Sequence, residues 1–347
     1  MVLVVNDAAD DSLHESPEHP ERPGRVQAAR AALTTLDLGS DLVVVPARVA
    51  TRAELSRVHA VGYLDELGAY CYGGGGDLDQ DTYATYDSWS IATLAAGAGL
   101  AVVTELQRRG DGVGFVAVRP PGHHALRDRA MGFCLLNNIA VSAAALVAQG
   151  ERVVIVDWDV HHGNGTQQIF WDEPNVLYIS LHQWPLFPGS GSPVEIGGPG
   201  ALGSVLNVPL PAGATGDVLR RALEDIVAPV VDAFGPTWVL VSAGYDAHYL
   251  DPMADLCLSD GDFADLASSV ARYVATPGRL AFFLEGGYHL DALRDSVGAT
   301  MAAVLGAPHA GEPSTNGGPG ASHLVSVAAQ RRAAFESWTR VAGEEAR

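Results

Sequence analysis

Short, nearly continuous apolar runs recur along the chain, and each is followed by a turn and then an alanine-rich stretch. Five of these runs are rich in β-branched and aromatic residues and predict strands at Val113–Val118, Val153–Val156, Val176–Ile179, Trp238–Val241 and Leu280–Leu284. Runs that are apolar at every position suit strands covered on both faces, as in a parallel sheet. The stretches between them predict helices at Ser90–Gln107, Asn138–Gln149, Asp217–Ala233 and Asp260–Val274. This alternation indicates one doubly wound α/β domain.

The remaining segments predict the ends of that domain and its loops. The apolar start, Met1–Val5, predicts a first strand. Gly73–Trp89 and Trp184–Gly203 predict long loops, which in a compact domain usually form lids or rims. We expect the main domain to span residues 1–305, followed by a Gly/Pro-rich linker at 306–324. A C-terminal helix and tail would occupy 325–347.

Polar residues of catalytic type follow each of the five predicted strands directly. In chain order they include His123 and His124, then Asp157, Asp159, His161 and Asn164, then Ser180, then Asp246, and finally Tyr288. In open α/β sheets, ligands bind outside the carboxyl ends of the strands. Five such endings therefore predict a single site.

Asp159, His161 and Asp246 are the candidate metal ligands. In extended backbone, residues i and i+2 point to the same side, so Asp159 and His161 face one point, and Asp246 can join them from another strand end. Two carboxylates and one imidazole leave a position open for water, as in catalytic zinc sites. Oxygen-rich ligand sets also accept Fe(II) or Mn(II). An Asp-x-His pair by itself is better explained as a buried hydrogen-bonded pair, and it is the third residue that favours a metal.

The candidate proton-transfer groups are His123 and His124, which follow a rigid Pro-Pro-Gly turn. Neutral imidazole can take a proton from the attacking water and return it to a leaving amine. Asp157 and Asn164 are candidates to fix their tautomers. Tyr288 follows Gly-Gly and could donate to a developing oxyanion. Taken alone, the His-His pair would be explained at least as well by two solvated loop histidines, and Tyr288 would be explained better by a packed turn tyrosine.

Composition excludes some partners. With a formal net charge of -20, the chain repels nucleic-acid phosphates, although it could attract a cationic substrate. The three cysteines, Cys71, Cys134 and Cys257, lie far apart and form neither a disulfide framework nor a thiolate zinc site. No apolar run approaches the ~18 residues that span a bilayer. We expect a cytoplasmic protein that binds neither membrane nor nucleic acid, either as a monomer or as a homo-oligomer.

Seven motifs between about residue 15 and residue 305 resemble the zinc-dependent histone deacetylases. They are Arg119–Ala125, Gly132–Asn138, Asp157–Gln167, Ser180–His182, Phe187–Gly191, Ser242–His248 and Leu284–Tyr288. Trp158 and Asn164 resemble the class II branch, which includes bacterial deacetylase-like amidohydrolases and acetylpolyamine amidohydrolases. The resemblance implies the arginase/deacetylase fold, a single α/β domain with an eight-stranded parallel sheet flanked by helices.

Residue by residue, the resemblance implies Zn²⁺ at Asp159, His161 and Asp246, with His123 and His124 as the catalytic pair and Tyr288 as the oxyanion donor. It also implies that the Gly132 carbonyl accepts the substrate amide N–H. Further implied contacts are the channel walls Phe133 and Phe187, the product-exit arginine Arg22 or Arg25, and the rim aspartate Asp79 or Asp81. The resemblance implies a structural K⁺ at Asp157, Ser180 and the carbonyls of Asp159, His161 and Leu181.

These features predict a zinc-dependent deacylase that hydrolyses an N-acyl amide, above all an N-acetyl amide, of a lysine-like side chain or small amine. One alternative is an acetylpolyamine amidohydrolase. Polyamine-selective relatives carry an acidic gatekeeper, and Met253 stands on the corresponding loop here, which favours acyl-lysine-like substrates. A non-catalytic acyl-lysine binding module is a second alternative, disfavoured by the presence of Tyr288. A manganese ureohydrolase would need extra aspartates that the sequence lacks.

Overall fold

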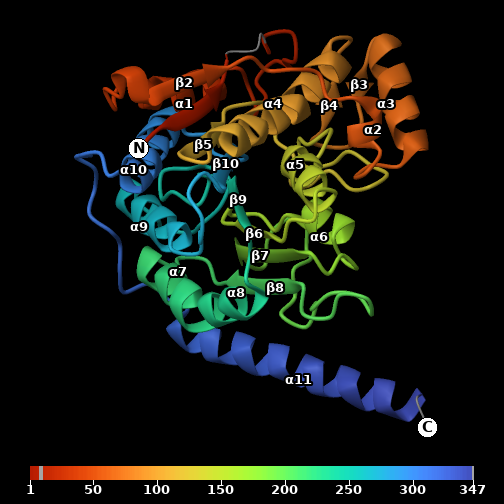
Figure 1. Ribbon diagram of the computed structural model, residues 1–347, viewed down its shortest axis with the longest axis vertical. Coiled ribbons are helices and arrows are strands. Elements are labelled where there is room, and N and C mark those ends of the chain that lie inside the picture. Colours follow the sequence, from red (N-terminus) through yellow and green to blue (C-terminus); the bar gives the residue numbers. More distant parts are fainter. Residues whose placement is uncertain (8–10, 346–347) are drawn as a thin grey trace.

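The computed structural model describes residues 1–7 and 11–345, with side chains described as far as residue 337. Its centre is one sheet of eight parallel strands in the order β2-β1-β5-β10-β9-β6-β7-β8 (Figure 1). The strands are β1 (Leu3–Asn6), β2 (Leu42–Val45), β5 (Val113–Val116), β6 (Val153–Asp157), β7 (Val176–Gln183), β8 (Val205–Leu210), β9 (Trp238–Ala243) and β10 (Leu280–Leu284). The predicted α/β class and eight-stranded parallel sheet are confirmed.

Helices cover both faces of the sheet, which is why its strands are apolar at every position. In β6, Val154 and Val156 pack into one hydrophobic core, whereas Val153 and Ile155 pack into the other. The first core is covered by α1 (Gly24–Thr34), α7 (Gly216–Ala222), α8 (Ala228–Phe234), α9 (Asp260–Ala271) and α10 (Leu290–Leu305). The second is covered by α2 (Arg52–Leu55), α3 (Val61–Tyr72), α4 (Ser88–Arg109), α5 (Asn138–Val147) and α6 (Asn164–Ile169) (Figure 1).

Some predicted boundaries were wrong for a physical reason. We expected a strand to stop at Ile179, but β7 continues to Gln183 because its polar residues are buried and pair with β8. The strand predicted to reach Val118 ends at Val116. The helix predicted at Asp217–Ala233 is divided into α7 and α8 by a π-helical turn, Leu223–Val227. The predicted helix starts at Asn138 and Asp260 are confirmed, whereas the C-terminal ends of these two helices and both ends of α4 differ by two or three residues.

The loops position the site. Trp184–Gly203 contains no helix or strand, as predicted. The segment expected as a loop at Gly73–Trp89 instead contains a two-residue hairpin, β3 (Gly76–Asp77) and β4 (Tyr83–Ala84), and α4 already begins at Ser88. A one-turn 3₁₀ helix, Gly39–Asp41, precedes β2.

Residues 306–320 contain no helix or strand, yet they are fixed to the domain by hydrogen bonds. The Thr315 N–H donates to the carboxylate of Asp262, and the Ser259 hydroxyl donates to the Pro313 carbonyl. The final helix, α11 (Ala321–Glu345), begins four residues before the predicted Val325 and extends past the edge of the sheet (Figure 1). The last two residues of the predicted tail, 346–347, lie outside the described residues.

Among the described residues, helix α4 is long and apolar enough to cross a membrane by length and composition. Such a helix was not predicted from the sequence, because no unbroken apolar run of that length was found. The most apolar window of α4 has a mean hydropathy of 1.4, and 67% of that window is buried inside the protein. Helix α4 packs on α5 and on the sheet. It therefore serves as the core helix of the second hydrophobic cluster.

Candidate active site

The predicted metal ligands meet at the carboxyl ends of two neighbouring strands, β6 and β9. Asp159 and His161 follow β6, and Asp246 follows β9. One ligand atom from each of these three buried residues lies within 4.8 Å of the others. The Nδ1 atom of His161 lies 3.2 Å from Asp159 Oδ1 and 3.2 Å from Asp246 Oδ2. Among the described residues, this is the group that could hold a metal ion.

The charges of this cluster fit a divalent cation. Asp246 Oδ2 is buried and has no hydrogen-bond partner in the structure, although a buried carboxylate oxygen is normally satisfied. Burial disfavours a charge on His161, yet the neighbouring carboxylates of Asp159 and Asp246 outweigh it and raise the pKa of His161 to about 10. Two carboxylates thus compete for one proton, and a cation in its place would satisfy both of them.

The two histidines that follow β5 have different partners. The Nδ1–H of His123 donates to Asp157 Oδ2 at 3.1 Å, and that of His124 donates to Asn164 Oδ1 at 2.8 Å. Each contact assigns the proton to Nδ1, because a carboxylate or amide oxygen accepts. The Nε2 atom of a neutral His124 is therefore free to accept a proton.

The same surroundings separate the pKa values of the pair. Burial opposes a charge on His123, but the carboxylates of Asp159 and Asp157 raise its pKa to about 10. Burial and the neighbouring His123 and His161 hold the pKa of His124 well below its usual value. A bound divalent cation would oppose the charge on His123 as well. The geometry therefore provides one neutral imidazole that can act as a base.

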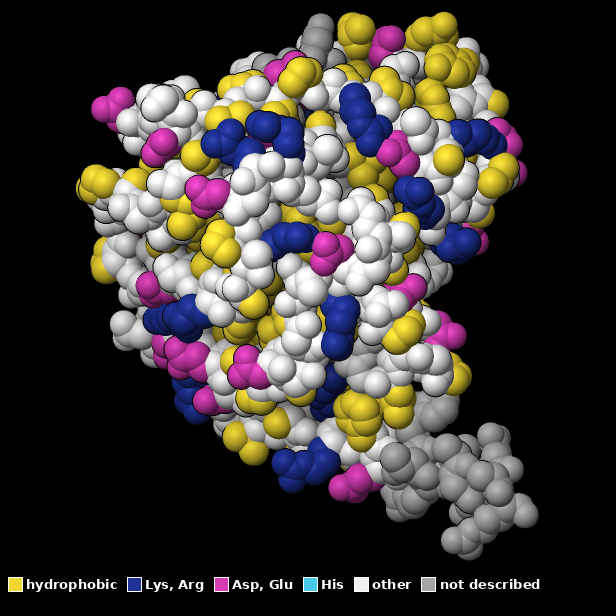
Figure 2. Space-filling model, in the orientation of Figure 1, with side chains coloured by type: hydrophobic (Ala, Val, Ile, Leu, Met, Phe, Trp, Pro, Cys, Tyr) yellow, Lys and Arg dark blue, Asp and Glu magenta, His cyan; other side chains and the backbone are white. Residues whose placement is uncertain are grey.

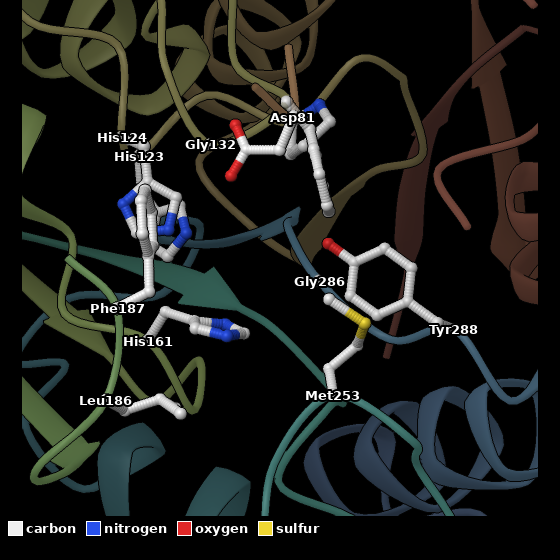
Figure 3. A pocket seen from close by; sticks show the side chains of 12 residues that line it. Asp81, His123, His124, Gly132, His161, Leu186, Phe187, Met253, Gly286 and Tyr288 are labelled. Carbon is white, nitrogen blue, oxygen red and sulfur yellow. The ribbon is translucent and has the colours of Figure 1, made fainter. Parts of the chain in front are cut away.

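Tyr288 faces the histidine pair from the opposite wall of a cavity of about 200 Å³, and its hydroxyl points into that cavity (Figure 3). Burial raises the pKa of this phenol well above its usual value, so Tyr288 remains a proton donor. Its ring packs edge-on against Phe133 at 5.8 Å between ring centroids. The phenol can therefore donate a hydrogen bond to an oxygen that becomes negative in the cavity.

Two glycines let the backbone approach the site closely. At Gly132 (φ +57), a side chain would collide with the ring of His124 at 2.5 Å. At Gly286, a side chain would meet Asp246 Oδ2 at 2.0 Å, and the Gly286 N–H donates to Asp159 Oδ2 at 2.8 Å. Both glycines line the cavity, so their backbone atoms can contact a bound ligand.

Apolar side chains form the rest of the cavity wall. Phe133 lines it as predicted. Phe187 and Met253 also line it as predicted, and Leu186 joins them (Figure 3). The ring of Phe187 packs edge-on against His124 at 5.1 Å between ring centroids. The predictions did not include Leu186, although it lies in the long loop expected to form a rim. The cavity thus combines an apolar wall with polar groups gathered at the metal cluster.

The structure separates the residues that the sequence left paired as alternatives. Asp81 lines the cavity, whereas Asp79 is exposed and accepts the N–H groups of Asp81 and Thr82 within its own turn. Arg25 is fully buried, its guanidinium lies 4.8 Å from the centroid of the Tyr288 ring, and it donates to the Gly287 carbonyl at 2.7 Å. Arg22 is exposed. Asp81 and Arg25 are therefore the members of each pair that can act at the site.

The residues expected around a potassium ion lie on adjacent strands. Asp157 of β6 is in register with Ser180 of β7, and both are fully buried, as is Leu181. Asp157 Oδ2 accepts from the Tyr178 hydroxyl, while Oδ1 accepts one backbone N–H, from Asp159. Because a carboxylate oxygen has two lone pairs, Oδ1 can take a second contact. Monovalent cations such as K⁺ are bound through oxygen atoms, and the oxygen atoms of Asp157 and Ser180 could serve as such ligands.

Two carboxylates outside the cavity lining were missed by the sequence analysis. Glu285 accepts the N–H groups of Gly122 at 2.7 Å and His123 at 3.1 Å. Asp251 accepts the N–H groups of Tyr288 at 2.6 Å and His289 at 3.0 Å. Burial raises the pKa of Glu285 to about 7 and that of Asp251 to about 6. Both hold the backbone of predicted site residues, a contact that no local motif reveals.

The molecular surface in Figure 2 carries acidic and basic side chains interspersed over the same face. The net charge of -20 is therefore not gathered there into one acidic patch. On this face, the described side chains form no surface of a single charge sign that would mark a binding site for a charged partner.

Comparison with known proteins agrees with this geometry. Residues 19–304 match the family model described as the histone deacetylase domain. The chain is 38% identical to "Histone deacetylase 10, chloroplastic" of Oryza sativa subsp. japonica, covering 85% of this chain and 71% of that protein. It is also 38% identical to "Histone deacetylase-like amidohydrolase" of Pseudomonas aeruginosa, covering 78% and 72%.

A solved structure titled "Crystal Structure of HDA15 HD domain" superposes with a TM-score of 0.86 at 34% sequence identity, covering 99% of this chain and 98% of that one. The arginase/deacetylase fold expected from the sequence is thereby confirmed. The family model spans every strand of the sheet except β1, together with the metal cluster, the histidine pair and Tyr288. This chain belongs to the histone deacetylase family and is a hydrolase of the deacetylase kind.

Proposed function

We propose that this protein is a zinc-dependent deacylase that removes an acetyl group from the amine of a lysine-like side chain. The observation that carries the proposal is convergence. Asp159, His161 and Asp246, the neutral imidazole of His124 and the hydroxyl of Tyr288 all face the same cavity or its base. That arrangement supports attack of water on an acyl carbonyl, because it supplies a base and an oxyanion donor at one point.

In the proposed reaction, the apolar walls of Phe133 and Phe187 hold the alkyl chain, and the carbonyl of Gly132 accepts the amide N–H. His124 takes a proton from the attacking water at Nε2, held in the required tautomer by Asn164. Tyr288 donates a hydrogen bond to the developing oxyanion. The proton on His124 then passes to the leaving amine. A bound Zn²⁺ would polarise the acyl carbonyl and make the water more acidic.

The roles of the flanking residues follow from their places. Asp157 accepts the Nδ1–H of His123 and so orients its ring beside the site. We assign the rim contact with the substrate backbone to Asp81 and the acetate exit to Arg25. A structural K⁺ at Asp157, Ser180 and Leu181 would hold the ends of β6 and β7 together. Fe²⁺ could replace Zn²⁺ at this oxygen-rich ligand set.

The cytoplasm is the compartment we propose. Its support is that Cys71, Cys134 and Cys257 are unpaired thiols, as expected in a reducing compartment. Unpaired thiols are equally compatible with the chloroplast, the compartment in the name of the rice relative.

The test is a turnover panel on metal-loaded protein with acetyl-lysine peptides and acetylspermidine, compared for Zn²⁺ and Fe²⁺ loading. We expect hydrolysis of acetyl-lysine and competitive inhibition by linear hydroxamates, which chelate an open metal position at the end of a narrow channel. Binding of acetyl-lysine without turnover would instead identify an acyl-lysine binding module. A fully active enzyme indifferent to hydroxamates would mean that the reaction occurs elsewhere.

A further inference from the structure

The carboxylate of Glu285 lies between the loop that carries the histidine pair and the turn that carries Tyr288. It directly follows β10, whose neighbours in the sheet are β5 and β9. Glu285 Oε2 accepts the N–H groups of Gly122 and His123, and Oε1 accepts the hydroxyl of Ser242 at 3.1 Å. The residue is 1% exposed. One side chain thus connects three strand ends.

Each connected strand end leads into the site. The β5 loop carries His123 and His124, the β9 loop continues to Asp246, and the β10 turn continues from Glu285 itself to Tyr288. Glu285 does not line the cavity. It also holds the backbone through its own N–H, which donates to the Ala243 carbonyl at 3.2 Å. Any effect of its side chain on a reaction must therefore pass through the groups that it holds.

We propose that Glu285 is a positioning residue that fixes the His123–His124 pair relative to the hydroxyl of Tyr288. The proposal rests on the deacylase function proposed above. Proton transfer and oxyanion stabilisation must act on the same acyl group, so the separation between imidazole and phenol has to be held closely. A misplacement of about 1 Å at such a site can lower the rate about 10²-fold.

The geometry requires reach, one acceptor oxygen for the two N–H groups and a polar partner for the Ser242 hydroxyl, but not charge. In Glu285→Gln, the side-chain carbonyl can still accept from Gly122 and His123, and the amide NH₂ can donate to the Ser242 hydroxyl, which also accepts. In Glu285→Asp, the charge remains, but the carboxylate is shorter by one methylene and cannot span the same partners. Buried N–H groups left without an acceptor would then draw the loop out of place or admit water.

The experiment compares these two variants with the wild type on an acetyl-lysine peptide. We expect Glu285→Asp to lower kcat about 10²-fold with KM and metal content near the wild-type values, and Glu285→Gln to keep most of kcat. Asp262→Ala is the matched control, because Asp262 is also a buried carboxylate that accepts backbone N–H groups, but beside residues 306–320. This control should lose stability and keep kcat.

The opposite ranking, with Glu285→Asp active and Glu285→Gln inactive, would show that charge matters and would overturn the proposal. So would a wild-type kcat in both variants. Crystal structures of the wild type and Glu285→Asp give a reading that does not need turnover: unchanged placement of both imidazoles relative to the Tyr288 hydroxyl would also overturn it. A wild-type protein that hydrolyses no acylated substrate would instead contradict the proposed function.

Discussion

Two regions of this protein bury carboxylates, and they differ in how completely these carboxylates are hydrogen-bonded. Beside residues 306–320, Asp262 accepts the N–H groups of Ser259 and Thr315 and pairs with Arg220 at 2.6 Å. At the strand ends, Asp246 lies beside Asp159, and its Oδ2 atom has no hydrogen-bond partner. Asp262 and Asp246 are both almost fully closed to solvent.

The difference separates groups that stabilise the fold from groups that perform chemistry. A buried carboxylate with a full set of donors contributes to the native state, and removing it leaves those donors unpaired. Two buried carboxylates without enough partners repel each other, and a fold retains such a pair where a ligand makes up the difference. Substitutions in the two regions should therefore change different quantities: activity at the strand ends, and stability beside residues 306–320.

The largest effect is expected from Asp246→Ala. Removing one of three ligands should abolish most of the metal affinity and nearly all turnover. Burial and the charge of Asp159 both raise the pKa of Asp246, so its loss relieves repulsion. The free energy of unfolding of the metal-free variant should lie within about 1 kcal/mol of that of the metal-free wild type. Metal analysis, kcat and urea denaturation measure the three quantities, and a variant with full metal and full turnover would exclude Asp246 as a ligand.

Tyr288→Phe should give the next largest effect and sharpen the comparison further, since it removes a single hydroxyl that points into the cavity. We expect kcat to fall by roughly 10²–10³, the usual result of deleting one oxyanion donor. Metal content and melting temperature should stay at the wild-type level. An unchanged kcat would remove Tyr288 from the mechanism.

Asp262→Ala should produce the opposite result. Arg220 keeps a second partner in Asp265 at 3.0 Å, so we expect a loss of about 3 kcal/mol in the free energy of unfolding, the low end for a broken buried pair. The kcat of the folded protein should not change. Urea denaturation and steady-state kinetics on the same preparation test both statements. A fall in kcat without a loss of stability would mean that the two regions are not independent.

The fold could be predicted wherever the strands are buried on both faces. Leu280–Leu284 was predicted at its observed limits, because a short, continuous apolar run between a basic and an acidic residue is typical of a buried strand. The edge strands β2 and β8 were not identified, since β2 is partly exposed and β8 contains Asn207 and Pro209. Polar residues inside β7 were interpreted as the end of the strand, because sequence alone does not show that they are buried.

The candidate site could be predicted as far as its motifs are local. Asp159 and His161 share one strand end, so their spacing alone places them together. The choice between Arg22 and Arg25 needed the start of α1, which turns Arg25 inward and leaves Arg22 outside. Glu285 was missed because its partners are backbone N–H groups about 160 residues away in the chain. Such contacts depend on the packed sheet and leave no pattern of side chains.

The smallest expected effect concerns substrate preference. Two residues of the cavity wall bear on it, one uncharged and one charged. Met253 and Asp81 both line it, and the thioether of Met253 packs against an alkyl chain without attracting a second ammonium group. We therefore expect a higher kcat/KM for acetyl-lysine peptides than for acetylspermidine, measured at two salt concentrations.

Met253→Glu tests this reasoning, because it adds the missing charge at the cavity wall. It should shift the ratio of the two kcat/KM values toward acetylspermidine by roughly fivefold, since an exposed ion pair contributes up to about 1 kcal/mol. The matched variant Asp81→Asn asks whether the existing carboxylate already takes that place. The net charge of -20 could also draw in polyamines, but this long-range attraction is screened by salt, whereas a contact within the cavity is screened much less. A wild-type preference for acetylspermidine that persists at high salt and disappears in Asp81→Asn would show that Asp81, and not residue 253, sets the specificity.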